Sequence, residues 1–123
     1  MNLKEFTDQQ REALLDLAML AMYADGHLAS VEDDRVHKLL TAMGFTTEFD
    51  RGKHYDAAVS RVSRHSQTAE AARAHTATLA QTFTTREDRR RVHDVLEDLL
   101  ASDSRVAPQE SDYLAVVREA FQM

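Results

Sequence analysis

The sequence predicts an all-α protein, a compact bundle of six or seven helices. Only three Gly and one Pro interrupt its 123 residues, and the helix-forming residues Ala, Leu, Glu, Arg and Gln are abundant, which favours helices joined by short connections. Hydrophobic residues make up 43% of the chain, enough to form a globular core. This length suits one domain, so we expect a single domain over residues 1–123.

The first expected helix begins at Thr7 or Asp8, both good N-cap residues, and continues to Tyr23. Its apolar run Ala13–Ala24 is interrupted only by Asp16. This run is shorter than the roughly 20 residues that span a bilayer, so it predicts a central helix covered by its neighbours. Because Asp16 falls in an apolar setting, we expect it to bond a neighbouring backbone donor.

Three further helices are expected over residues 30–43, 47–63 and 68–83. In the first of these, the apolar residues Val36, Leu39, Leu40 and Met43 follow helical spacing, and Gly44 is a typical C-terminal stop. Gly52 marks a candidate break in the second. The third is rich in Ala and carries few bulky side chains, so we expect it to be thinly packed.

The fifth expected helix begins with the capping box Thr84-Thr85-Arg86-Glu87, where a threonine hydroxyl and Glu87 satisfy each other's free backbone donors. Its apolar residues form the clearest helical stripe in the chain: Val92, Val95, Leu96, Leu99 and Leu100. The sixth begins at Pro108, a favoured first helical residue.

An internal repeat relates the two ends of the chain. A shift of 78 residues aligns Asp16–Leu40 with Asp94–Arg118, and five of the 25 aligned pairs are identical. These pairs are Asp16/Asp94, Asp25/Asp103, Ala29/Ala107, Glu32/Glu110 and Asp34/Asp112. Each copy consists of an apolar helix, a short loop that opens with Asp, and a second helix with Glu near its first turn. The sequence therefore contains two related helix–loop–helix units.

Charge is distributed unevenly along the chain. The formal net charge is −6, but residues 51–91 carry nine basic and four acidic residues, a net +5, while the flanks carry a net −11. The overall sign disfavours nucleic acid as a partner. The arginine cluster at Arg86 and Arg89–Arg91 lacks interleaved aromatic residues for base stacking, so a solvated helix face is favoured there.

Four acidic residues of the repeated loops are the best candidates for a site: Asp25, Glu32, Asp103 and Glu110. Their carboxylates could bind Ca²⁺ or Mg²⁺, since both ions prefer oxygen ligands. The same residues could instead act only as loop and helix caps. An EF-hand is excluded, because Glu32 follows Asp25 by seven residues and does not stand at loop position 12.

The loops 23–32 and 101–110 resemble the Ala-Asp-Gly, apolar, Glu signature of the tellurite-resistance TerB family. The first reads Tyr-Ala-Asp-Gly-His-Leu-Ala-Ser-Val-Glu and the second Ala-Ser-Asp-Ser-Arg-Val-Ala-Pro-Gln-Glu. The second departs from the signature at Ser104, where Gly is usual. The resemblance implies an all-helical, cytoplasmic domain of a tellurite and stress-response system, with membrane-associated partners and a divalent metal on its acidic loop residues.

We therefore expect a non-enzymatic TerB-like domain that binds a divalent cation, a protein partner or both, without inserting into a membrane. The polar start Met1–Glu5 lacks the apolar stretch of a secretory signal. The alternative is a purely protein-interacting scaffold whose acidic loops serve as caps. Acid–base catalysis is disfavoured, because no catalytic histidine or lysine motif and no cofactor motif accompanies the four acids. None of the six histidines lies in a His-Glu-x-x-His or paired Glu-x-x-His motif.

Overall fold

The structure, a computed structural model, describes residues 3–23, 34–100 and 108–123. Six helices account for most of these residues: α1 (Asp8–Tyr23), α2 (Asp34–Ala42), α3 (Glu48–Ser63), α4 (Ala69–Ala80), α5 (Arg86–Leu100) and α6 (Pro108–Phe121). No strand occurs in this part of the chain. The predicted all-α class is thus confirmed, as a bundle of six helices.

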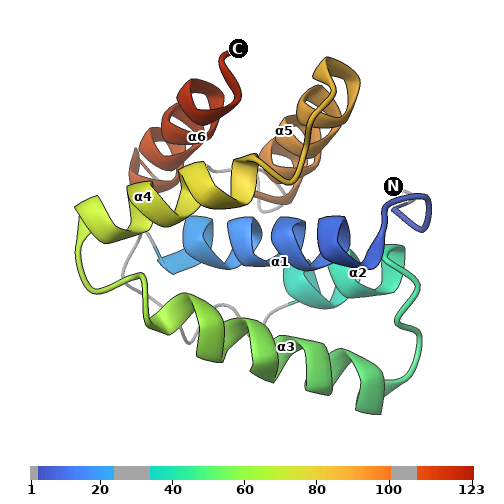
Figure 1. Cartoon of the computed structure of the whole chain (residues 1–123). Helices are drawn as coiled ribbons and strands as arrows, with labels where there is room; N and C mark the ends of the chain where they lie inside the picture. The colour runs from blue at the N-terminus through green and yellow to red at the C-terminus, as the bar shows by residue number, and fades with distance from the viewer. Residues whose placement is uncertain (1–2, 24–33, 101–107) are drawn as a thin grey trace.

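Helix α1 lies at the centre of the bundle. It packs against each of the other helices, with α2 and α3 on one side and α4, α5 and α6 on the other (Figure 1). Every residue from Ala13 to Ala21 is buried. The expected central helix is therefore confirmed, and none of the described helices is long and apolar enough to cross a bilayer.

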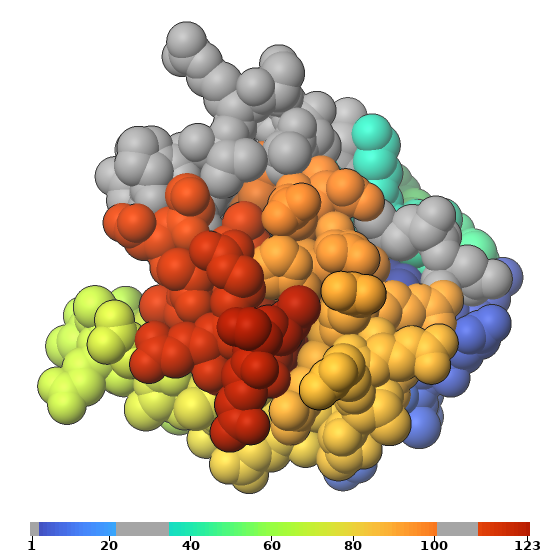
Figure 2. Space-filling view, turned by 90° about the horizontal axis from the view of Figure 1, so that it is seen from above, coloured from blue at the N-terminus to red at the C-terminus, as the bar shows by residue number. Residues whose placement is uncertain are grey.

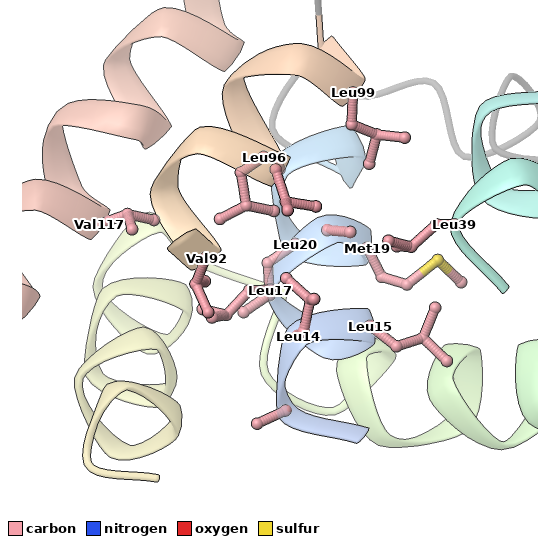
Figure 3. Packing of buried hydrophobic residues seen from close by; sticks show 14 of the residues in the cluster. Leu14, Leu15, Leu17, Met19, Leu20, Leu39, Val92, Leu96, Leu99 and Val117 are labelled. Atoms are coloured by element: carbon pink, nitrogen blue, oxygen red, sulfur yellow. The ribbon is translucent and has the colours of Figure 1, made fainter. Parts of the chain in front are cut away.

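Apolar side chains of α5 pack against α1 to form the middle of the core. Val92, Leu96 and Leu99 follow α5 in the direction in which Leu14 and Leu20 follow α1 (Figure 3). The two helices are in contact, and α5 is steeply inclined to α1 in the view of Figure 1. Each fully buried Leu or Val contributes about 1.5–3 kcal/mol relative to an exposed one, which makes the contact between α1 and α5 a major source of stability.

The structure extends the internal repeat toward the N-terminal end of each unit. The hydroxyl of Thr7 accepts a hydrogen bond from the amide at the start of α1 at 3.1 Å, and Thr85 does the same for α5 at 3.0 Å. Arg11 then donates to the carbonyl of Met43 at 3.0 Å. Its counterpart 78 residues on, Arg89, donates to the carbonyl of Phe121 at 3.2 Å. In each unit this arginine ties the first helix to the end of the second.

The second helix of each unit ends in the same way. Gly44 after α2 and Gln122 after α6 have positive φ angles of 103° and 60°. The next amides, those of Phe45 and Met123, bond back to carbonyls five residues earlier at 3.0 and 2.9 Å. This is the Schellman arrangement, which satisfies carbonyls at a helix end. In the described residues, the two helix–loop–helix units are thus alike at the start of the first helix and at the end of the second.

Helix α3 continues through Gly52, so the candidate break there is not present. A Cβ atom on Gly52 would meet no other atom within 4 Å, and the helix pays only the entropic cost of Gly at this position. The hydroxyl of Thr47 caps α3, and that of Thr68 caps α4. Both expected helix starts are therefore confirmed.

The N-cap of α5 is Thr85, one residue later than the predicted capping box required. Its hydroxyl accepts from the amide of Asp88, three residues on, whereas Glu87 would have needed Thr84 as the cap. Thr84 is exposed. The two adjacent threonines carry equal cap chemistry, and the residue before them, Phe83, is buried in the core.

Replacement of Thr85 with Ala should lower the free energy of unfolding by about 1 kcal/mol, the usual cost of an N-cap. Thr84→Ala is the matched control and should change it by less than about 0.5 kcal/mol. Urea denaturation of the two variants measures both values. A greater loss in Thr84→Ala than in Thr85→Ala would show that Thr84 is the N-cap.

Candidate functional site

Three of the four predicted site residues, Asp25, Glu32 and Asp103, lie outside the described residues. Glu110 belongs to the first turn of α6, and its side chain also lies outside the described part. Their role as a metal site therefore stays a prediction. Within residues 3–23, 34–100 and 108–123, no three His, Asp or Glu side chains group in a way that could hold a metal ion.

The helices that lead into the two acidic loops are described. Residues 24–33 follow α1, and residues 101–107 follow α5. These two helices contact each other. That the two loops lie in one region stays a prediction of the repeat.

A buried ion pair joins α1 to α3. Arg61 donates from Nε and from one terminal nitrogen to the two carboxylate oxygens of Asp16, at 2.9 and 2.8 Å. Only 3% of the Asp16 side chain is exposed, against 33% of Arg61. Glu12, one turn before Asp16, lies 3.5 Å from the same guanidinium. The expected bond from Asp16 to a backbone donor is thus replaced by a two-point bond to a side chain.

Burial raises the pKa of Asp16 above its usual value near 3.8, and the hydrogen bonds and charge of Arg61 oppose that rise. The carboxylate itself raises the pKa of Arg61. An unpaired charge at this depth would cost several kcal/mol. Arg61 is therefore the group that allows a carboxylate within the central helix.

The repeat does not extend to this ion pair. Asp94, the counterpart of Asp16, has a side chain that is 68% exposed. In the first unit α3 covers the matching face of α1, whereas no described helix covers Asp94 on α5. The two aspartates are the same residue in the repeat, but one is buried and the other is exposed.

Two histidine rings lie beside the ion pair. His75 of α4 stacks on His65, which follows α3, with ring centroids 3.9 Å apart. The Nε2 atom of His75 is buried and has no hydrogen-bond partner in the described part of the chain. Burial lowers the pKa of His75, the neighbouring His65 and Arg61 lower it further, and Asp16 acts in the opposite direction. Folding therefore disfavours the protonated ring.

A buried hydrogen bond joins α4 to α6. The hydroxyls of Thr76 and Tyr113 lie 2.7 Å apart, and Thr76 also donates to the carbonyl of Ala72. Burial raises the pKa of Tyr113 far above its usual value, so the phenol stays neutral. With Asp16, Arg61 and the histidines, these residues form a polar cluster under α4. The sequence did not reveal the cluster, because its members come from four separate helices and the segment after α3.

Helix α4 has a cavity on each side. One of about 510 Å³ lies toward α1 and includes Glu12, Asp16 and Thr82 in its lining. The other, of about 610 Å³, lies toward α6 and includes Tyr113. These spaces are consistent with the thin packing expected of an Ala-rich helix, and both reach the polar cluster.

Replacement of Arg61 with Met removes the charge and keeps an unbranched apolar chain. We expect a loss of about 3 kcal/mol in the free energy of unfolding near pH 7, which is the lower end of the usual range for a broken buried ion pair. The lower end applies because one-third of the Arg61 side chain is exposed. The exposed neighbour Arg64 provides the control Arg64→Met, with an expected change within about 0.5 kcal/mol. Urea denaturation measures both.

The same variant should show a defined pH dependence. Without Arg61, burial raises the pKa of Asp16 further, so the folded state holds a proton that the unfolded chain releases above about pH 4. Stability then falls as the pH rises. The deficit of Arg61→Met should thus be larger at about pH 7.5 than at about pH 5. Equal deficits at both pH values would contradict the ion-pair assignment.

Comparisons with known protein families, with curated proteins and with solved structures gave no match. The resemblance to the TerB family therefore rests on the loop residues and the repeat.

Proposed function

We propose that this chain is a non-enzymatic, TerB-like binding domain of a cytoplasmic tellurite and stress-response system. In this proposal the acidic loops bind a divalent cation, Ca²⁺ or Mg²⁺, and present it to a protein partner at the membrane. The observation that carries the proposal is the contact between α1 and α5, the helices that lead into the two loops. It supports a site shared between the loops.

The loop residues have the chemistry for such a site. Asp25 and Glu32 from the first loop and Asp103 and Glu110 from the second would supply hard oxygen ligands. Carboxylates from two copies of one unit would approach a single ion from two sides. The net charge of −11 on the flanks of the chain also favours attraction of a cation.

The described polar groups support a binding role over acid–base catalysis. Asp16 has both oxygens engaged by Arg61, so neither is open to a substrate. Tyr113 is buried, and its hydroxyl is bonded to Thr76. These groups hold helices together, and a catalytic base would need an accessible lone pair.

Calorimetric titration with Ca²⁺, Mg²⁺, Mn²⁺ and Zn²⁺ tests the proposal. We expect at least one of the oxygen-preferring ions to bind, and Asp25→Ala or Asp103→Ala to weaken its affinity by about tenfold or more, equivalent to about 1.4 kcal/mol. Asp56→Ala, at an exposed position on α3, is the control and should leave the affinity unchanged. Absence of heat with every ion would refute the metal site and favour the scaffold alternative, in which the loops only cap helices.

A further inference from the structure

A groove of about 610 Å³ lies on the surface between α4 and α6. Leu20 of α1 and Tyr113 of α6 are buried at its floor, and Val116 and Ala72 are half-buried on its walls. Figure 2 shows the start of α4, in yellow-green, beside α6, in red. Binding sites for small molecules and side chains have volumes of about 300–1,000 Å³, so the groove is large enough to take side chains of a partner.

The edges of the groove are charged. Asp112 and Glu119 line it from α6 and are exposed. They are seven residues apart, which places them two turns apart on the same face of the helix. Arg73 lines the groove from α4 and is also exposed. The α6 edge is therefore acidic along two turns, and the opposite edge carries one positive charge.

The groove is formed in the free protein. The hydrogen bond of 2.7 Å between Thr76 and Tyr113 fixes α4 to α6 beneath it. Small side chains, those of Ala69, Ala72 and Ala115, line its walls and leave room for another backbone to approach closely. A ligand would therefore meet an existing apolar surface, which lowers the ordering cost of binding.

We propose that this groove binds an amphipathic helix of a basic protein partner. An apolar side chain of that helix would insert over Leu20, Tyr113 and Val116. Basic residues seven positions apart on it would pair with Asp112 and Glu119, since residues two turns apart share one face of a helix. The proposal rests on the described residues of α1, α4 and α6 and does not depend on the predicted cation ligands.

Selection from a display library of random 16-residue peptides on the intact protein tests the proposal. We expect the enriched peptides to carry a bulky apolar residue and two Lys or Arg residues about two turns apart. Fluorescence anisotropy of synthetic copies then measures their affinity. Absence of enrichment, or enrichment of acidic peptides, would overturn the proposal.

Variants locate the binding surface. Ala115→Trp, which fills the groove, and the double variant Asp112→Lys/Glu119→Lys should each weaken peptide binding by about tenfold or more. Ala77→Trp on α4 and Glu97→Lys/Asp98→Lys on α5, all at exposed positions outside the groove lining, are the matched controls. Equal losses in groove and control variants would overturn the proposal as non-specific charge attraction. Ala115→Trp, which leaves the charge unchanged, should also keep the calorimetric response to cations, and this separates the proposal from the function of the loops.

Discussion

The fold depends on a central helix that has no solvent-facing side over nine consecutive residues. All residues from Ala13 to Ala21 on α1 are buried, and one of them is Asp16. A carboxylate in that position requires a partner from a neighbouring helix, and Arg61 of α3 supplies it with two hydrogen bonds. The ion pair therefore fixes the rotation of α1 about its axis as well as the place of α3 beside it.

The internal repeat accounts for much of the remaining architecture. Thr7 and Thr85 begin equivalent helices, and Arg11 and Arg89 bond equivalent carbonyls 32 residues further on. Each unit thus contains its own residues that cap the first helix, bond that helix to the end of the second, and terminate the second. The units differ in what covers them, as the exposure of Asp94 and the burial of Asp16 show. The first helix of one unit, α1, lies at the centre of the bundle. The first helix of the other unit, α5, lies on one side of it.

The sequence was sufficient where local chemistry decides the structure. The spacing of apolar residues predicted all six described helices, and the 78-residue shift predicted the paired units. It was insufficient where equal residues compete, as with Thr84 and Thr85, because both threonines carry the same cap chemistry. The sequence also could not predict the partner of Asp16, because 45 residues separate Arg61 from Asp16 and no local pattern connects them.

The candidate functional residues also fall into two groups, those that the sequence reveals and those that only the structure reveals. The identical pairs Asp25/Asp103 and Glu32/Glu110 could be found from the sequence alone, because a repeat is a local comparison. The polar cluster under α4 and the groove beside it depend on helices brought together by the fold, so only the structure reveals them. The pairs Thr7/Thr85 and Arg11/Arg89 lie at the same 78-residue shift and extend the repeat before Asp16.

The central claim is that two copies of one helix–loop–helix unit meet and hold a single ion between their loops. Paramagnetic broadening by Mn²⁺, an ion with the same oxygen preference as Mg²⁺, tests it directly in ¹⁵N NMR spectra of the intact protein. We predict that substoichiometric Mn²⁺ broadens the amide resonances of residues 25–32 and 103–110 together, with the same dependence on ion concentration. Broadening of one loop alone, or of neither, would contradict the claim.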